Sequence, residues 1–284
     1  MLKFFLFLSI LLSLFICLLI STPECFAQNL HNENNCKIQL IRNATLKITY
    51  AGFTFLTDPM FSPRGAIKPF AGIERNPTKE LPLKIEDIIK GVDCVLVTHL
   101  HPDHFDTVAC EALPKEIPLF CQPGDEDAIK NAGFINIAAV ETSREWNGIT
   151  IIRTGGKHGS GKILERMGKV SGYIFTAKNQ PTLYWVGDSI LCDEVKDAMN
   201  KYKPEIIITH SGGAKIPGFD PIVMDSEQTI KLANIASKAS VVAVHMEALD
   251  HCAVTRETLR KDAEKAGIPS TKLIIPKDGE TLSF

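Results

Sequence analysis

The sequence has no excess of positive charge, since 31 lysines and arginines stand against 33 aspartates and glutamates, giving a net charge of −2. Proteins that bind nucleic acid usually carry a basic surface, so we do not expect nucleic acid as a partner. Internal repeats and low-complexity tracts are also absent. The remaining composition, 45% apolar and 23% charged over 284 residues, is that of a globular protein with one large domain or two small ones.

Cysteine pairs of the form Cys-x-x-Cys are absent, which argues against a cysteine zinc knuckle or a thioredoxin-like site. Two of the eight cysteines, Cys17 and Cys25, lie in an N-terminal leader. The even number that remains permits disulfides in an exported protein. Cys94, however, lies inside an apolar run with strand character, where a buried free thiol is the simpler interpretation. The six cysteines beyond the leader are Cys36, Cys94, Cys110, Cys121, Cys192 and Cys252.

The leader has the features of a targeting segment. One lysine precedes residues 4–20, which are almost wholly apolar, and the small residues Cys25 and Ala27 follow. This pattern predicts a secretory signal peptide over residues 1–27 and an exported protein, periplasmic or secreted. Because the apolar run nearly reaches the length that spans a bilayer, an uncleaved membrane anchor is the alternative, and only then do we expect membrane contact.

Beyond the leader we predict a polar linker over residues 28–43 and a single domain over residues 44–284. Residues 61–70 are rich in proline and glycine and cannot form regular structure; a long loop of this kind often covers a binding site, and the alternative is a surface loop without a role. Short apolar runs predict strands, and helical spacing with capping residues predicts helices, so the fold class is α/β or α+β. Strands are expected at 46–50, 53–57, 92–97, 118–121, 135–140, 149–153, 172–177, 182–186, 205–209, 241–244 and 273–275, and helices at 85–90, 107–113, 125–131, 193–202, 226–238 and 255–266.

The densest group of chemically active residues follows the apolar run at residues 94–97. His99, His101, Asp103 and His104 arrive within six residues. Imidazole nitrogens and carboxylate oxygens are the usual donors to Zn²⁺ and similar ions. Burying so many polar groups at the end of a core strand costs free energy unless a partner such as a metal satisfies them. The spacing His-x-His-x-Asp-His therefore predicts a metal site; the alternative is a solvated turn.

Four further residues of the same types lie at the ends of predicted strands or in the loops that follow them. They are His158, Asp188, His210 and His245. Strand ends along one edge of a sheet are places where a fold can gather distant side chains. We therefore expect these residues to join the group after residue 97.

The His-x-His-x-Asp-His spacing is the signature of the metallo-β-lactamase superfamily, which the chain resembles from about residue 44 to its end. The resemblance implies a four-layer αββα sandwich, in which two mixed sheets pack face to face and helices cover both outer faces. It also implies a metal-dependent hydrolase that carries two divalent ions, most simply Zn²⁺, and uses a hydroxide shared by the two ions as nucleophile.

The resemblance also implies a role for each residue. Asp188 would bridge the two ions, because an anion between them offsets their repulsion. Asp103 would both bind metal and orient the water, and Asp58 would hold the N–H of a ligand histidine; a turn-forming Asp before proline is the alternative for Asp58. One ion would be held by His99, His101 and His158, and the other by Asp103, His104 and a late histidine.

The late histidine is a choice between two strand ends. In the resembling branch a Met-Asp-x-Glu helix start, here residues 224–227, precedes the strand that ends in the ligand, which indicates His245. His210 would then line the pocket as a substrate contact or proton donor. His251 is a weaker candidate for the same duty, with a surface histidine as the alternative.

Residues 57–64, Thr-Asp-Pro-Met-Phe-Ser-Pro-Arg, are similar to the branch that contains N-acyl-phosphatidylethanolamine-hydrolysing phospholipase D and, more distantly, ascorbate-6-phosphate lactonase. This implies hydrolysis of a phosphodiester or related ester in a small-molecule or lipid-derived substrate. Residues 246–252 depart from the Trp-Gly-Thr-Phe-like run of that phospholipase, which weakens the case for a lipid. The alternatives are a lactonase or amide hydrolase of the same fold, an iron-bound redox enzyme, and a non-catalytic metal-binding protein.

Overall fold

The computed structural model describes residues 36–284, so the predicted leader over residues 1–27 lies outside the described residues. Within them, the strands form two mixed seven-stranded sheets. The first sheet has the order β14 (Thr281–Ser283), β1 (Lys37–Arg42), β2 (Thr45–Tyr50), β3 (Phe53–Thr57), β4 (Cys94–Leu96), β5 (Leu119–Cys121) and β6 (Ile137–Ala139). The second has the order β13 (Leu273–Ile274), β12 (Ser240–Val244), β11 (Ile206–His210), β10 (Leu183–Trp185), β9 (Gly172–Ala177), β8 (Ile149–Thr154) and β7 (Ser143–Trp146).

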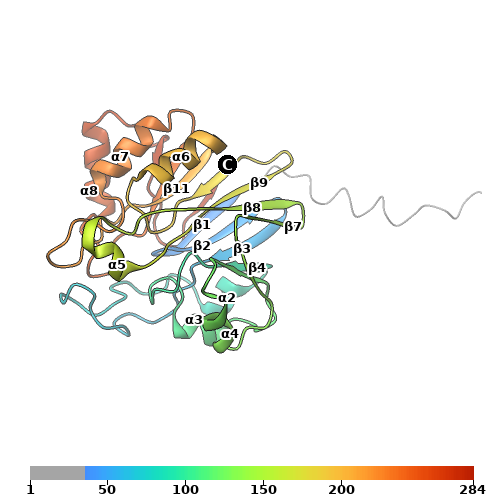
Figure 1. The fold of residues 1–284 in the computed structure, drawn as a ribbon. Coiled ribbons are helices and arrows are strands. Elements are labelled where there is room, and N and C mark those ends of the chain that lie inside the picture. Colours follow the sequence, from blue (N-terminus) through green and yellow to red (C-terminus); the bar gives the residue numbers. More distant parts are fainter. Residues whose placement is uncertain (1–35) are drawn as a thin grey trace, which may run out of the picture. The chain divides into compact units, whose positions relative to one another are not determined.

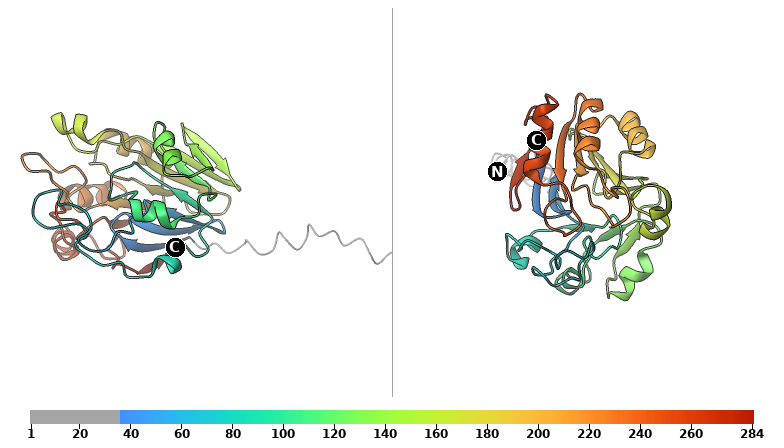
Figure 2. Two further views of the ribbon diagram at one scale, coloured as in Figure 1. Left: turned by 90° about the horizontal axis from the view of Figure 1, so that it is seen from below. Right: turned by 90° about the vertical axis from the view of Figure 1, so that its left-hand side faces the viewer.

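The two sheets pack face to face, and helices cover both outer faces (Figures 1 and 2). Successive residues of a strand point to opposite faces of its sheet. In β11, Ile206 and Ile208 therefore enter the core between the sheets, whereas Ile207 packs under the helices of the second sheet. The first sheet is covered by α2 (Ile85–Ile89), α3 (Thr107–Ala112) and α4 (Glu126–Asn131), and the second by α6 (Asp193–Tyr202), α7 (Ser226–Ile235) and α8 (Arg256–Lys265). The four-layer sandwich predicted from the sequence is confirmed.

Three helices begin at residues that satisfy the free backbone N–H groups of a first turn. Asp106 accepts a hydrogen bond from the backbone N–H of Ala109 at the start of α3, and Asp225 and Thr255 cap α7 and α8 in the same way. Because Asp106 lies two residues after His104, this cap also fixes where the histidine-rich loop ends.

The predicted linker over residues 28–43 is wrong where the structure describes it, because Lys37–Arg42 forms β1. The segment alternates: Ile38 and Leu40 are buried in the core between the sheets, whereas Lys37 is exposed. This period-two pattern marks a half-buried strand, although its polar residues resemble those of a linker.

Several shorter elements were also absent from the prediction. They are β7, β14, the 3₁₀ helix η1 (Gly161–Ile163) and α5 (Leu164–Met167). The other strands and helices lie within a few residues of their predicted ranges. All six cysteines of the described part carry free thiols, and Cys94 is fully buried in the core as expected. No helix in residues 36–284 has the length and apolar character needed to cross a bilayer.

Candidate metal centre

Strands of both sheets deliver the predicted site residues to one place at an edge of the sandwich. The structure brings together all of them, and each is buried except His101, which is half-buried. They are Asp58 after β3, His99, His101, Asp103 and His104 after β4, His158 after β8, Asp188 after β10, His210 at the end of β11 and His245 after β12.

The turn that follows β10 depends on Gly187. Its backbone has φ +72°, a conformation that favours glycine, and a Cβ atom there would lie 2.6 Å from the backbone oxygen of Ser171. The absence of a side chain lets the chain turn sharply against its neighbour. This turn brings Asp188 from the end of the strand into the group of histidines.

His99, His101 and His158 form the first group of candidate metal ligands. Each offers one ring nitrogen, and these atoms lie within 4.8 Å of one another. Nε2 of His99 is 2.8 Å from Nδ1 of His101, a separation that two lone pairs keep only with a proton or a cation between them. Nδ1 of His158 donates to the backbone oxygen of Ile222 at 2.9 Å, which leaves Nε2 of this ring unprotonated and free to bind metal.

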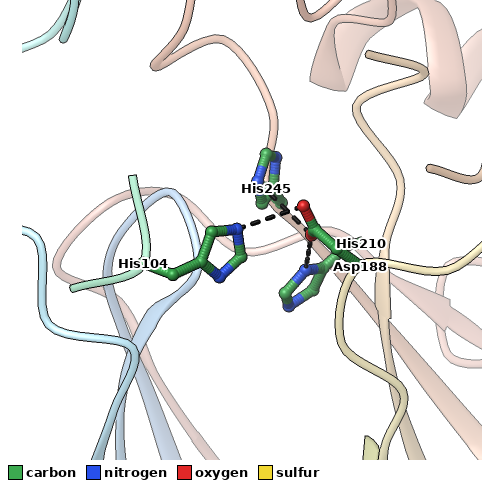
Figure 3. Close-up of side chains that lie close together, drawn as sticks. All are labelled: His104, Asp188, His210 and His245. Carbon is green, nitrogen blue, oxygen red and sulfur yellow. Dashed lines mark hydrogen bonds and ion pairs between the residues drawn. The ribbon is translucent and has the colours of Figure 1, made fainter. Parts of the chain in front are cut away.

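His104, Asp188, His210 and His245 form a second group (Figure 3). Oδ2 of Asp188 lies 3.1 Å from Nε2 of His104, and Oδ1 lies 3.5 Å from Nε2 of His245. Oδ2 also lies 3.3 Å from Nε2 of His158, which belongs to the first group. The Asp188 carboxylate therefore stands between the two groups and is within reach of ring nitrogens from both.

Asp103 completes the second group. Its Oδ2 lies 3.4 Å from Nε2 of His104 and 3.3 Å from Nε2 of His245. Nε2 of His245 is buried and has no hydrogen-bond partner among the described residues. A buried polar atom without a partner is costly, and this one faces carboxylate oxygens of Asp103 and Asp188. A divalent cation among these atoms would satisfy all of them, so the donor set fits a metal ion.

Burial sets the protonation of these groups. It lowers the pKa of His158 to about 4 and the pKa of His99 well below its ordinary value, because a charged imidazolium is disfavoured away from water. Both rings are therefore neutral at pH 7 and can offer a lone pair. Burial alone would raise the pKa of Asp188, but the interactions of its carboxylate with the neighbouring imidazole rings, His104 first and then His245, outweigh burial and hold this pKa well below its usual range.

Asp58 lies behind His104 rather than in the group itself. Its Oδ2 is 2.6 Å from Nδ1 of His104, and the same carboxylate accepts the backbone N–H and the hydroxyl of Thr98, each at 2.7 Å. With Nδ1 donating to Asp58, Nε2 of His104 carries the lone pair and faces Asp188. This is the contact that the resemblance implied for Asp58. The alternative, an aspartate that only forms a turn before proline, does not account for it.

His210 is fully buried, and both of its ring nitrogens have partners inside the protein. Nδ1 lies 2.5 Å from Oδ1 of Asp188, and Nε2 accepts a hydrogen bond from Nε1 of Trp185 at 3.1 Å. The ring has no exposed surface to offer a ligand, which contradicts the predicted role of His210 as a substrate contact or proton donor. Trp185 was not predicted, because a tryptophan in an apolar strand is indistinguishable from an ordinary core residue.

His251 is only 9% exposed, so the alternative of a surface histidine is wrong. Its ring packs edge-on against Phe70 at a centroid distance of 5.1 Å. The neighbouring Asp250 carboxylate accepts the backbone N–H groups of Phe70 at 2.9 Å and of Ala71 and Ile73 at 3.1 Å. The proline- and glycine-rich loop is irregular as predicted, and Asp250 fixes its end beside the site.

A cavity of about 390 Å³ opens beside the first group of ligands. It reaches His99 and the half-buried His101, so it gives access to the candidate metal centre. Its other lining residues are Leu100, Gln122, Pro123, Gly124, Asp125, Met167, Gly168 and Lys169. They come from the loops after β4 and β5 and from the end of α5, the short helix that was not predicted.

Comparison with known proteins agrees with this geometry. The sequence model of the β-lactamase superfamily domain matches residues 54–246. The chain is 36% identical over 253 residues to the UPF0173 protein YddR of Bacillus subtilis, covering 87% of this chain and 99% of that one. The chain therefore belongs to the metallo-β-lactamase superfamily. It is also 26% identical over 210 residues to a UPF0173 metal-dependent hydrolase of Koribacter versatilis, covering 70% and 84% of the two chains.

Solved structures give the same result. A structure of isothiocyanate hydrolase from Delia radicum gut bacteria shares 36% identity and a TM-score of 0.84, covering 87% of this chain and 99% of that one. A possible metal-dependent hydrolase from Veillonella parvula shares 36% identity and a TM-score of 0.85, with coverage of 88% and 99%. The chain is thus similar, over nearly the whole of these relatives, to proteins described as hydrolases.

Proposed function

We propose that this metal-dependent hydrolase of the metallo-β-lactamase superfamily holds two divalent ions, most simply Zn²⁺, where its two groups of ligands meet. The observation that carries the proposal is the position of Asp188, whose oxygens lie 3.1–3.5 Å from ring nitrogens of His104, His158 and His245. One ion would be held by His99, His101, His158 and Asp188, and the other by Asp103, His104, His245 and Asp188.

When bound, such a pair of ions lowers the pKa of a water from about 15.7 toward 7 and polarises the substrate. The negative charge of Asp188 offsets repulsion between two cations. Asp103 directs Oδ2 toward both His104 and His245, where it can orient a water and accept its proton. The half-buried His101 lies at the cavity, so substrate would reach the site along this ring.

An isothiocyanate is the first candidate substrate. The relative described as an isothiocyanate hydrolase is matched over 99% of its length at 36% identity. Water would add to the central carbon of R–N=C=S. The bond between this carbon and the nitrogen would then break, which releases the amine R–NH₂ and carbonyl sulfide. The apolar side chains of Leu100, Pro123 and Met167 line the cavity and suit an uncharged R group.

A phosphodiester or related ester is the second candidate. The chain is 27% identical over 197 residues to an N-acyl-phosphatidylethanolamine-hydrolyzing phospholipase D of Caenorhabditis elegans, covering 63% of this chain and 54% of that one. Lys169 lines the same cavity and supplies a positive charge for a phosphate. A two-metal site suits this reaction because charge develops on both the attacking and the leaving oxygen.

Metal analysis and two substrates test the proposal. Protein purified without added metal is first analysed for bound ions. It is then loaded with Zn²⁺, analysed again, and incubated with benzyl isothiocyanate or bis(p-nitrophenyl) phosphate. We expect two ions and release of benzylamine, or of p-nitrophenolate if the second candidate is correct. One bound iron without hydrolysis of either compound would indicate a redox enzyme, and two ions with no turnover of any ester, lactone, amide or isothiocyanate would indicate a non-catalytic metal-binding protein.

Three variants separate the two metal positions. His101→Ala removes a ligand of the first group only, and His245→Ala one of the second only, so each should keep one ion. Asp188→Ala should lose both ions and turnover. Asp220→Ala, at an exposed loop residue, is the matched control and should keep two ions and full activity. If His101→Ala and His245→Ala removed the same single ion, the dinuclear proposal would be wrong.

We further propose that the protein acts outside the cytoplasm, because of the predicted leader. Mass spectrometry of the mature N-terminus is the test. Cleavage near residue 27 supports export, whereas an intact leader in the membrane fraction supports the anchored alternative.

A further inference from the structure

A chain of two hydrogen bonds links the side chain of Trp185 to the carboxylate of Asp188 through His210. Nε1 of Trp185 lies 3.1 Å from Nε2 of His210, and Nδ1 of His210 lies 2.5 Å from Oδ1 of Asp188. Trp185 and His210 have no exposed surface, and Asp188 is 3% exposed. The two aromatic residues come from neighbouring parallel strands, in which Trp185 is paired with Ile208.

The indole of Trp185 decides which nitrogen of His210 carries the proton. An indole N–H can only donate, so Nε2 of His210 must accept and must hold a lone pair. A neutral imidazole then has its proton on Nδ1, where it donates to the Asp188 carboxylate. His210 is thereby left without a lone pair facing the group of ligands, although its Nδ1 lies close enough to them to be grouped with them.

Two simpler roles for His210 conflict with this arrangement. A metal ligand would need a lone pair on Nδ1. The hydrogen bond from Trp185 to Nε2 places the ring proton on Nδ1, so Nδ1 has no lone pair to offer. A proton donor to the substrate would need exposed surface, and the ring has none. The His210 ring also lies beside the rings of His245 and His104, at centroid distances of 5.0 and 5.7 Å, but its hydrogen bonds are made to Asp188 and Trp185. A buried group that donates its proton to Asp188 can act on the site through Asp188.

We propose that Trp185 and His210 position the Asp188 carboxylate so that it can bridge the two metal positions; this rests on the proposed function. The bond from His210 holds Oδ1 of Asp188 and stops the carboxylate from rotating about its Cβ–Cγ bond. Oδ2 then faces His104 and His158, while Oδ1 keeps its remaining lone pair for the side of His245. His210 is a positioning residue, and Trp185 fixes its proton.

The hydrogen-bonded chain from Trp185 through His210 to Asp188, here called the relay, has a measurable consequence for metal affinity. Residues that orient metal ligands through hydrogen bonds typically change metal affinity by about 10–100-fold when they are removed. His210→Ala should therefore still bind two Zn²⁺ ions, each about 10–100-fold more weakly in competition with a chelator. His210→Asn should recover part of this affinity, because its amide N–H occupies nearly the place of Nδ1–H.

The two tryptophans of the chain offer a matched pair of variants. Trp185→Phe removes the indole N–H and keeps an aromatic ring, so it should weaken Zn²⁺ binding less than His210→Ala does. Trp146→Phe changes the other tryptophan, which is half-buried and packs against Phe53 and Phe55 at the border of the core, and should leave Zn²⁺ affinity unchanged.

Nitrogen-15 NMR of histidine-labelled wild-type protein tests the tautomer without any variant. We expect His210 to show a proton on Nδ1 and none on Nε2, both with and without Zn²⁺. A proton on Nε2 would overturn the proposal, as would the outright loss of one ion from His210→Ala or an unchanged affinity in that variant. If the wild-type protein bound fewer than two ions, the proposed function would fail, and the tautomer would still report on the relay.

Discussion

Asp58 and His104 are joined by a 2.6 Å hydrogen bond between Oδ2 and Nδ1, at a place where neither side chain has any exposed surface. The acceptor comes from the end of β3 and the donor from the loop after β4, two parallel neighbours in the first sheet. The bond fixes the direction in which the other nitrogen of His104 points. The Asp58 carboxylate therefore determines how His104 is oriented in the candidate metal centre.

Asp58→Asn should weaken metal binding while it keeps the shape of the side chain. An amide has a single acceptor oxygen and cannot accept from both Nδ1–H of His104 and the backbone N–H of Thr98, so we expect the affinity for Zn²⁺ to fall by about 10–100-fold. Competition with a chelator measures it. Asp93→Asn is the control, because Asp93 accepts the backbone N–H of Thr54 in an analogous bond away from the site. Equal affinities of Asp58→Asn and the wild-type protein would contradict the prediction.

Metal removal should lower the thermal stability of the protein. A ligand that binds only the folded state adds about 2.7 kcal/mol of stability at a free concentration of 100 times its dissociation constant. Zn²⁺ should therefore raise the unfolding temperature of metal-free protein, and a chelator should reverse the change. Asp188→Asn should show little of this response in differential scanning calorimetry. A full response in that variant would show that Zn²⁺ binds elsewhere.

Asp250 should contribute stability that depends on pH. Burial alone would raise its pKa, but the hydrogen bonds from Asn76 and from the backbone of Phe70, Ile73 and Ala71 outweigh this effect and lower the pKa below its usual value. A lowered pKa in the folded state means that the contribution is present above the ordinary value of about 3.9 and is lost as pH falls through the folded value.

We therefore expect Asp250→Ala to lower the free energy of unfolding by about 1–3 kcal/mol at pH 7, and the deficit to shrink below about pH 4. Denaturant unfolding across this pH range is the measurement, and hydrogen exchange should show faster opening around Phe70. The exposed Asp220→Ala should stay within about 0.5 kcal/mol of the wild-type protein at every pH. A deficit that grew as the pH fell would reverse the expected sign.

The core between the sheets should be sensitive to its aromatic residues. Phe175 of β9 is fully buried and meets Phe55 of β3 edge to face at a centroid distance of 5.1 Å, which joins the two sheets. Phe175→Ala should cost about 3–5 kcal/mol of stability, because it leaves a cavity. Phe219→Ala, at a site that is 38% exposed, should cost far less, and a comparable loss of stability in the two variants would argue against this explanation.

The sequence predicts the parts of this molecule that local patterns encode. His99 to His104 follow a short apolar strand, and the spacing of their side chains alone indicates a metal site. Asp188 and His245 follow strands in the same way, so strand ends were a sufficient guide to where they would meet. The structure places all of these residues together.

The sequence does not reveal features that depend on distant partners. The donor to His210 comes from Trp185 on the adjacent strand, and the loop near Phe70 is held by Asp250, far along the chain. Strand β7 was missed because its residues are mostly exposed and carry no apolar alternation. In each case the deciding interaction joins segments whose proximity only the fold establishes.

The pairing of β1 with β14 has a consequence for how the chain folds. Gln39 donates from its side chain to the backbone oxygen of Gly279, a residue 240 positions away in sequence. Closing so long a segment costs chain entropy before any contact is gained, so this rim of the sheet should form late and refolding should be slow. Until it forms, β1 presents an open strand edge along which partly folded molecules can associate with one another.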